Sequence, residues 1–317
     1  MKIALLGTGF GQAHAAVYAQ RTDVDQVVVF GRTPDKLAKI AGQFGFAATT
    51  DLGSAITDPS VDLVDICLPT RLHADVAVRA LQAGKDVLIE LPLAGTLEDA
   101  HRIIAAQQAT GRQAFVDMFS RFTPANQHLR QAVAGQRHGP LKVLEIEGRT
   151  ALLWEGYDLG LDTLALDMMH ADFDLVTGLL GRPATITAAG VDGATGRGSA
   201  ATVLLGYPDA LARITSSALM PQPYGMRGGW RATFPGAVLE YDMRAGFTGQ
   251  GPATLTEHTA DGEHPIDLPA ASPYETMIDH VLACLNGQAG NLIEPSSALL
   301  ALELTLDVHR RLTQPAS

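Results

Sequence analysis

Cysteine is nearly absent from this chain of 317 residues. Only Cys67 and Cys284 occur, and neither lies in a CxxC or Cys/His ligand spacing. A disulfide framework and a structural zinc site are therefore not expected. We expect no bound metal and a reducing, cytoplasmic setting.

Positive charge is also scarce. The 23 Lys and Arg residues stand against 34 Asp and Glu residues, which gives a formal net charge of −11 at pH 7. Because no concentrated basic face is evident, we expect neither a nucleic-acid nor a membrane-surface partner. The sequence also lacks a run of about eighteen apolar residues and a signal-peptide pattern, which predicts a soluble protein without a membrane span.

The most informative pattern lies at residues 3–14, where a short apolar run breaks into closely spaced glycines. A strand that turns sharply at Gly7 and exposes its backbone at Gly9 can approach a pyrophosphate, and the next helix then presents its free N–H groups to the anion. The spacing is imperfect, because Gln12 stands where the third glycine usually falls. The flanking strand and helix patterns still favour a dinucleotide-binding turn over a purely structural one. The candidate phosphate-binding residues are Gly7, Thr8, Gly9, Phe10 and Gly11.

Up to about residue 117 the chain alternates short apolar runs with amphipathic stretches, which predicts an α/β domain with a doubly wound parallel sheet. Ligands bind at the carboxyl ends of the strands in such sheets, so the turns after the strands should gather around one crevice. The predicted strands are Ile3–Leu6, Val27–Phe30, Leu63–Leu68, Val87–Glu90 and Gln113–Asp117, and the helices between them include Pro34–Phe44, His73–Ala83 and Leu97–Thr110.

After residue 120 consecutive strand-like stretches follow one another, which predicts a mostly antiparallel sheet in an α+β domain. A single helix is expected over Thr163–Leu180. We therefore expect two domains, a dinucleotide-binding domain at residues 1–120 and a second domain at residues 121–317. The second domain should contain strands at Lys142–Arg149, Thr185–Val191, Ala201–Tyr207, Leu211–Leu219, Trp230–Phe234, Ala237–Met243 and Ala253–His258, and further helices at Pro124–Ala134, Tyr274–Leu285 and Pro295–Leu312.

The end of the second predicted strand bears on the choice of nicotinamide cofactor. NAD-binding domains place an acid there to accept from the ribose hydroxyls, but here Gly31 takes its place. Arg32 can pair with a 2′-phosphate and Thr33 can add a hydroxyl, which favours NADP(H) over NAD(H). The alternative for Arg32 is stacking on the adenine alone. Lys36 is a further candidate contact, and its alternative is a solvated helix face.

Three further segments carry a family resemblance. They read Leu-Pro-Thr-Arg-Leu-His at 68–73, Ala-Gly-Lys-Asp-Val-Leu-Ile-Glu-Leu-Pro-Leu-Ala at 83–94, and Asp-Met-Met-His-Ala-Asp-Phe-Asp at 167–174. With the glycine turn, they make the chain resemble the glucose-fructose oxidoreductase, inositol dehydrogenase and rhizopine catabolism (Gfo/Idh/MocA) family from end to end. The resemblance implies a Rossmann domain, a second domain whose open sheet forms one wall of the substrate pocket, and a homodimer or homotetramer. It adds to the cofactor-binding candidates Leu68, Pro69, Thr70, His73, Glu90, Leu91 and Pro92.

Two departures from the family pattern affect the expected chemistry. The family has Glu-Lys-Pro where residues 90–92 read Glu-Leu-Pro, so the lysine that supports proton transfer is replaced by a side chain with no proton to give. The family's histidine would fall at Ala171, whereas His170 lies three residues after Asp167. Because a three-residue step stays on one side of a helix, His170 could take that role beside Asp167, or the role could be lost.

The remaining candidates come from other loops. Tyr157 could deliver the proton that the missing lysine would have supplied. Trp154 offers an aromatic face that suits a carbohydrate ring, although a loop at a subunit interface has a similar composition. Arg121 and Asp174 are candidate substrate contacts, and Arg121 could instead only tie the domains together. His73 could equally be a neighbour of a helix start without ligand contact.

These features predict an NADP(H)-dependent oxidoreductase. The resemblance implies hydride transfer to or from the carbonyl or hydroxyl carbon of a sugar, a cyclitol or a sugar-derived intermediate. Because the lysine and histidine departures occur together, two alternatives stay open. One is an imine reductase of the same fold, and the other is a nucleotide-binding protein without redox turnover.

Overall fold

The chain divides into two compact units. The structure is a computed structural model that describes residues 1–152, 158–194, 196–245 and 251–314. Unit 1 comprises Met1–Phe119 and Pro273–Leu299, and unit 2 comprises Ser120–Ser272 and Leu300–Ser317. The sequence pattern predicts a second domain over all of residues 121–317, whereas the segment Pro273–Leu299 packs with the first unit.

Unit 1 is built on a six-stranded sheet whose neighbouring strands are all parallel, in the order β3-β2-β1-β4-β5-β6. This is the doubly wound arrangement expected from the alternating pattern, and the predicted fold class is confirmed. The short strand β3 was not predicted. The strands are β1 (Lys2–Leu6), β2 (Gln26–Phe30), β3 (Ala47–Thr49), β4 (Leu63–Ile66), β5 (Asp86–Ile89) and β6 (Ala114–Val116), and the helices are α1 (Gly11–Tyr18), α2 (Pro34–Phe44), α3 (Leu52–Thr57), α4 (His73–Gln82), α5 (Leu97–Thr110) and α9 (Pro273–Leu285).

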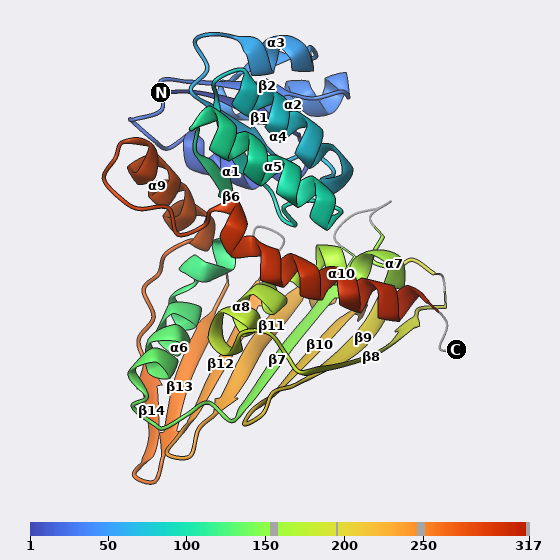
Figure 1. Cartoon of the computed structure of the whole chain (residues 1–317), viewed down its shortest axis with the longest axis vertical. Helices are drawn as coiled ribbons and strands as arrows, with labels where there is room; N and C mark the ends of the chain where they lie inside the picture. Colours follow the sequence, from blue (N-terminus) through green and yellow to red (C-terminus); the bar gives the residue numbers. More distant parts are fainter. Residues whose placement is uncertain (153–157, 195, 246–250, 315–317) are drawn as a thin grey trace. The chain divides into compact units, whose positions relative to one another are not determined.

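Burial explains why the central strands read as apolar runs. Residues 3–6 of β1 are fully buried, because a parallel sheet is covered by helices on both faces. The late helix α9 packs beside α1 (Figure 1). An ion pair between Arg21 and Asp279 joins the two segments. The backbone N–H of Val116 in β6 also donates to the carbonyl of Ile293 at 2.8 Å, so the returning segment completes this unit.

Unit 2 contains an eight-stranded sheet in the order β14-β13-β12-β11-β7-β10-β9-β8. Its neighbours are antiparallel except for β7 and β10, so the prediction of a mostly antiparallel sheet is confirmed. Strand β14 was not predicted. The strands are β7 (Val143–Ala151), β8 (Thr185–Asp192), β9 (Ser199–Gly206), β10 (Leu211–Met220), β11 (Met226–Thr233), β12 (Val238–Ala245), β13 (Ala253–Thr259) and β14 (Gly262–Ile266), and the helices are α6 (Pro124–Gly135), α7 (Leu161–Asp167), α8 (His170–Leu180) and α10 (Leu299–Thr313).

One face of this sheet carries the hydrophobic core of unit 2. Helices α6, α7, α8 and α10 cover that face (Figure 1), and the core joins helix residues such as Leu129, Leu164 and Phe173 to the inward side chains of the strands. Alternation along β9 is regular, with Val203 and Leu205 buried and Leu204 exposed. None of the described helices covers the opposite face of the sheet (Figure 1).

The predicted single helix over Thr163–Leu180 is wrong. Helix α7 ends at Asp167 and α8 begins at His170. The N–H groups of Met168 and Met169 both donate to the carbonyl of Leu164, which interrupts the regular hydrogen-bond ladder between the two helices. The side chain of Met169 is fully buried in the core of unit 2.

No helix in the described ranges of the chain is both long enough and apolar enough to cross a membrane.

The tight turn after β1 can be tested by adding one carbon atom. We expect Gly7→Ala to lower the free energy of unfolding by about 2 kcal/mol or more. Its φ is +129°, and the new Cβ would lie 2.2 Å from the Cys67 carbonyl oxygen. Urea unfolding measures the change. In the control Gly9→Ala the Cβ would meet nothing within 4 Å, so a change within about 0.5 kcal/mol is expected. Equal losses in the two variants would contradict the close approach at Gly7.

Candidate functional site

The glycine turn leads from β1 into α1 and packs against the end of β4. The N–H of Gly7 donates to the carbonyl of Phe30 at 3.0 Å, which anchors the turn to the end of β2. Gly9 and Phe10 are exposed, and the space around the α-carbon of Gly9 is open. Gly11 is buried, and a Cβ there would touch Cys67 at 3.4 Å. A ligand can therefore reach the backbone at Gly9, whereas the backbone at Gly7 and Gly11 packs against Cys67.

The start of α1 carries no acidic side chain. Phe10 at the N-cap offers no side-chain hydrogen bond, and the first turn of the helix contains no acidic residue. The positive end of the helix dipole therefore meets no competing carboxylate, while the N–H groups of Gln12 and Ala13 donate to the carbonyls of Gly9 and Phe10 at 3.1 Å and 2.9 Å. With the open space at Gly9, these residues fit the phosphates of a dinucleotide.

The turn after β2 carries the residues proposed to read the ribose. Gly31 is buried, and a Cβ there would lie 2.8 Å from Cγ2 of Thr8, so an acidic side chain would displace Thr8. Arg32, Thr33 and Lys36 are exposed. Within the described ranges, neither Arg32 nor Lys36 forms an ion pair, so both can reach a ligand. The nearby Asp35, in the first turn of α2, is a competing negative charge.

The loops after β4 and β5 are joined by His73. The ring is 1% exposed, with Nδ1 3.0 Å from the carbonyl of Pro92 and Nε2 2.7 Å from the carbonyl of Leu68. Burial lowers its pKa. With both nitrogens facing backbone carbonyls, the ring braces the two loops and has no nitrogen left for a ligand. Around it, Pro69 is exposed and Leu68, Thr70, Glu90 and Leu91 are partly exposed.

A buried polar cluster that the sequence analysis missed lies beneath the glycine turn. The Nδ1 of His14 lies 2.7 Å from Asp65 and its Nε2 lies 2.9 Å from Asp117. The Tyr18 hydroxyl also donates to Asp65, at 2.7 Å. Burial alone would lower the pKa of His14, but the two carboxylates outweigh it and hold that pKa well above its usual value. The ring is therefore an imidazolium between two carboxylates.

The sequence did carry a signal for this cluster. Asp65 interrupts the apolar strand β4, and Asp117 directly follows the buried strand β6. A carboxylate in a fully buried parallel strand must find a partner, because an unpaired buried charge is too costly. The pattern shows that a cationic partner is needed, but it does not show that the partner is His14.

In unit 2, His170 begins helix α8 and is fully buried apart from 1% of its surface. Its Nδ1 lies 2.7 Å from the hydroxyl of Thr305, and that hydroxyl itself donates to the carbonyl of Ala301 at 2.7 Å. Because Thr305 has only one proton, Nδ1 of His170 must be the donor and Nε2 carries a lone pair. Within the described ranges Nε2 has no hydrogen-bond partner. Burial lowers the pKa of His170 to about 4, so the ring is a neutral acceptor near neutral pH.

Asp174 lies one turn after His170 and is paired with arginine. Its carboxylate accepts two bonds from Arg121, from Nε at 2.9 Å and from Nη2 at 2.7 Å. Arg130 approaches the same carboxylate at 3.7 Å. A bidentate pair with a buried acid holds the guanidinium in a fixed orientation. Arg121 and Asp174 thus lie together in unit 2, and Arg130 is an addition that the sequence analysis missed.

The continuous helical spacing from which the pairing of Asp167 with His170 was predicted is not present. Because the helix is interrupted between them, Asp167 is exposed at the end of α7 while His170 is buried at the start of α8. The charges that act on His170 are those of Asp174 and Arg121. Trp154 and Tyr157 lie outside the described residues.

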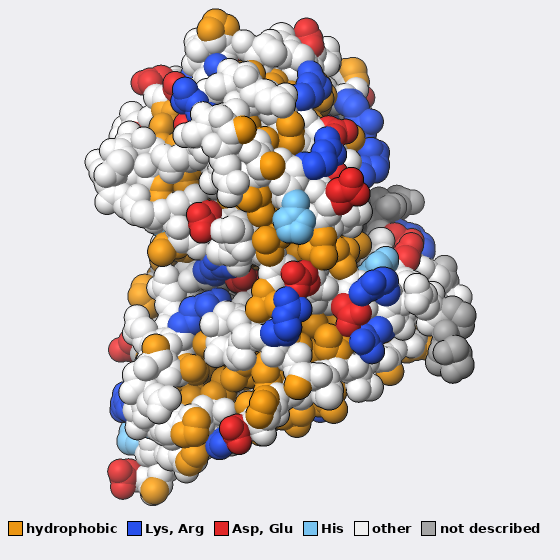
Figure 2. Space-filling view, viewed as in Figure 1, with side chains coloured by type: hydrophobic (Ala, Val, Ile, Leu, Met, Phe, Trp, Pro, Cys, Tyr) orange, Lys and Arg blue, Asp and Glu red, His pale blue; other side chains and the backbone are white. Residues whose placement is uncertain are grey.

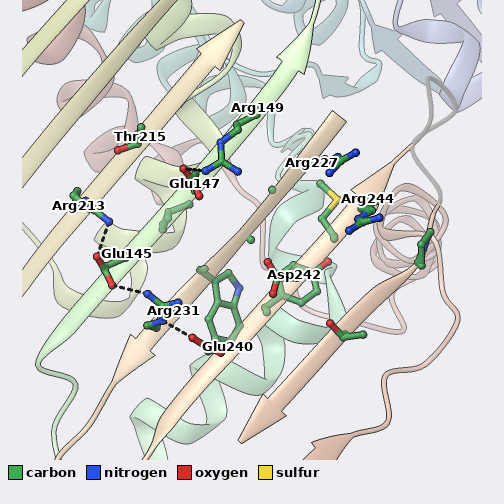
Figure 3. Close-up of a pocket in the computed structure, with 18 of the residues that line it drawn as sticks. Glu145, Glu147, Arg149, Arg213, Thr215, Arg227, Arg231, Glu240, Asp242 and Arg244 are labelled. Carbon is green, nitrogen blue, oxygen red and sulfur yellow. Dashed lines mark hydrogen bonds and ion pairs between the residues drawn. The ribbon is translucent and has the colours of Figure 1, made fainter. Parts of the chain in front are cut away.

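The open face of the unit 2 sheet forms a hollow lined by charged side chains from β7, β10, β11 and β12. Figure 3 shows a chain of ion pairs across these strands, in which Arg213 pairs with Glu145, Glu145 with Arg231, and Arg231 with Glu240. Three large apolar side chains, Leu204, Leu211 and Leu219, are also exposed on this sheet. On the side of the molecule that Figure 2 shows, acidic and basic side chains are interspersed.

Comparison with known proteins supports the nucleotide-binding geometry of unit 1. Residues 1–118 match the model of the Gfo/Idh/MocA family, described as an oxidoreductase family with an NAD-binding Rossmann fold. Over these residues, which contain the sheet of unit 1, the chain is similar to this family. The resemblance stated from the sequence motifs is therefore confirmed.

Named relatives agree with this assignment. The 4-carboxy-2-hydroxymuconate-6-semialdehyde dehydrogenase of Sphingobium sp. is 32% identical over 152 residues, and this match spans about half of each chain, 47% of both. The UDP-N-acetylglucosamine 3-dehydrogenase of Acidithiobacillus ferrooxidans is 29% identical over 70% of this chain and 69% of that protein. A solved structure of the latter has a TM-score of 0.82 at 24% identity, over 98% of this chain and 97% of that one, which shows a shared fold.

Proposed function

We propose that the chain is an NADP(H)-dependent oxidoreductase that transfers hydride to or from the carbonyl or hydroxyl carbon of a sugar, a cyclitol or a sugar-derived intermediate. The observation that carries the proposal is the open glycine turn before an uncapped helix, in a unit that matches an NAD-binding Rossmann family. A bound nicotinamide nucleotide supplies or accepts the hydride. The residues of unit 1 bind the nucleotide, and those of unit 2 bind the substrate.

The proposed substrate class rests on hydroxyl-binding groups and on relatives. The lone pair at Nε2 of His170 can accept a hydrogen bond from a substrate hydroxyl, and the guanidinium of Arg121 can donate to a substrate oxygen. The Acidithiobacillus relative is named for a nucleotide sugar. Asp167, exposed at the end of α7, is a further candidate. Tyr157 stays a proposal from the sequence alone.

Hydride transfer itself is the direct test. We expect the wild-type protein to move deuterium from NADPH labelled at the reactive C4 to the carbonyl carbon of at least one member of a panel of keto sugars and keto cyclitols, as measured by mass spectrometry. Gly9→Asp is the control, because it places a carboxylate in the open space where the phosphates would bind, so nucleotide binding should weaken at least about tenfold. Label found only in reduced imines would favour an imine reductase. Saturable binding without any transfer would favour a protein without turnover.

The preference for NADP(H) rests on the turn after β2. A small buried residue, Gly31, leaves no acid to repel a 2′-phosphate, and Arg32 is an exposed cation without an ion-pair partner in the described part of the chain. A guanidinium can bind a phosphate through two parallel hydrogen bonds. NAD(H) is the alternative, in which Arg32 only stacks on the adenine.

Substitution of Arg32 distinguishes the two cofactors. We expect Arg32→Ala to weaken NADPH binding about 10-fold to 100-fold, which corresponds to the loss of a charge-assisted hydrogen bond worth about 1.5–3 kcal/mol. The affinity for NADH should change less than about threefold, since it lacks the phosphate. Titration calorimetry measures both. Lys39→Ala, which removes an exposed cation of the following helix α2, is the matched control and should leave both affinities unchanged. Equal weakening of both cofactors by Arg32→Ala would refute the 2′-phosphate contact.

We also propose that the chain forms a homodimer or homotetramer through the open face of the unit 2 sheet. That face combines the exposed leucines Leu204, Leu211 and Leu219 with ion-paired arginines and glutamates. Exposed apolar side chains gathered on one sheet are typical of a surface that a partner covers. Charges that are already paired also cost less to bury than single charges.

Reversal of one charge on the open face of the unit 2 sheet tests the proposed assembly. Arg231→Glu would place a third carboxylate between Glu145 and Glu240, and we expect the oligomer to dissociate to monomers at micromolar concentration. Light scattering after size-exclusion chromatography reports the mass. Arg182→Glu reverses another exposed, paired arginine away from this sheet face and should leave the mass unchanged. A monomeric wild-type protein would exclude the proposed assembly.

A further inference from the structure

Glu90 is the acidic residue next to position 91, where the family has a lysine and this chain has a leucine. It follows β5 directly and precedes Leu91. The side chain is partly exposed, and one carboxylate oxygen, Oε2, accepts the N–H of Leu91 at 2.9 Å. It therefore stands at the carboxyl edge of the parallel sheet, where ligands of doubly wound folds bind.

The buried side of Glu90 meets the polar cluster beneath the glycine turn. One ligand atom each from Glu90, His14 and Cys67 lie within 4.8 Å of one another. Cys67 is also the residue against which Gly7 and Gly11 pack. One side of Glu90 thus faces solvent, and its other side faces the buried cluster beneath the glycine turn. All of these residues belong to unit 1.

The cluster contains more acid than base. Two buried carboxylates, Asp65 and Asp117, share one imidazolium, and Oδ1 of Asp117 has no hydrogen-bond partner in the described part of the chain. A third ionised carboxylate would add uncompensated negative charge to a poorly solvated region. Burial, followed by the charge of Asp117, accordingly raises the pKa of Glu90 to about 8, while His14 acts in the opposite direction. Five titratable groups from the surrounding elements face Glu90. They are His14 of α1, Asp65 of β4, Cys67 just after β4, Asp117 just after β6, and Tyr274 of α9.

The contacts of the His14 ring fit a protonated imidazole better than a metal ligand. The two ring nitrogens of His14 are both at hydrogen-bond distance from carboxylates, 2.7 Å and 2.9 Å. A ligating nitrogen must instead give its lone pair to the metal. The geometry is that of a protonated ring.

We propose that Glu90 is the catalytic acid and base of this chain, and that it exchanges the proton of the reacting oxygen in place of the missing lysine. The proposal rests on the proposed function. In the reduction, the substrate carbon gains hydride from the reduced nucleotide, the C=O π pair moves to oxygen, and that oxygen takes the carboxyl proton of Glu90. Glu90 is left as a carboxylate and regains a proton from solvent at its exposed side. The oxidation follows the same steps in reverse.

His14 and Asp117 act on this reaction as positioning residues. They do not reach the substrate, but their charges set the pH at which Glu90 loses its proton. An acid and base whose pKa lies near the working pH transfers protons most effectively in both directions. His170 does not fill this role, because its ring is neutral and its free nitrogen has no proton to donate.

Infrared spectroscopy tests the proton without requiring turnover. We expect the wild-type protein at pH 7 to show a carboxylic acid C=O band that is absent from Glu90→Gln and that disappears as the pH rises through about 8. Asp117→Asn removes a negative charge at constant shape, so the same band should disappear at lower pH. Glu98→Gln, at an exposed acid in the first turn of α5, is the control and should leave the band unchanged. A band that is identical in Glu90→Gln and wild type would overturn the proposal.

Kinetics tests the role of that proton. Glu90→Gln is expected to lower kcat about 10²-fold to 10⁴-fold when NADPH is saturating, with the thermal unfolding midpoint unchanged. In the wild type, kcat for reduction should fall as the pH rises through the pKa of Glu90, and Asp117→Asn should move that fall to lower pH. A Glu90→Gln protein with wild-type kcat would refute Glu90 as the acid while leaving the proposed function intact. Absence of hydride transfer in the wild type would instead refute the proposed function, and with it this role of Glu90.

Discussion

The position of helix α1 depends on one buried imidazole. His14 and Tyr18 lie one turn apart on this helix, and both bind Asp65 in β4, while His14 also reaches Asp117 after β6. Removal of one partner from a buried ion pair typically costs about 3–5 kcal/mol, because the remaining charge is left without compensation. Since α1 begins at the glycine turn, the same contacts fix where the first N–H groups of the helix point. The architecture of unit 1 and its proposed chemistry therefore share one polar cluster.

The sequence predicted unit 1 well where the signal was local. The glycine turn, the alternation of strands and helices, and the missing acid at Gly31 can all be read from neighbouring residues, and the parallel sheet followed from them. Strand β3 was missed because it has only three residues, and two of them are alanines. The His14 cluster was missed for a different reason. Its members are 51 and 103 positions apart, and hydrophobic periodicity does not indicate which buried charges meet.

In unit 2, contacts between residues far apart in the sequence also decide features that the local pattern does not predict. The helical pattern over 163–180 is continuous in the sequence, but the backbone breaks at Met168 and Met169, where packing of a buried methionine overrides helix propensity. The break separates Asp167 from His170. The partner of His170 is Thr305, 135 residues away on α10, and it alone decides which ring nitrogen carries the proton. Motif spacing could name the histidine, but its protonation state follows only from the tertiary contact.

The return of Pro273–Leu299 to unit 1 affects how the protein folds during its synthesis on the ribosome. The first 119 residues emerge long before the backbone partner of Val116 and the helix α9 that packs beside α1. Chains fold domain by domain as they are synthesised, so unit 1 keeps an uncovered side while residues 120–272 are made. Neither unit is complete until the end of the chain is synthesised, because Pro273–Leu299 completes unit 1 and Leu300–Ser317 then completes unit 2.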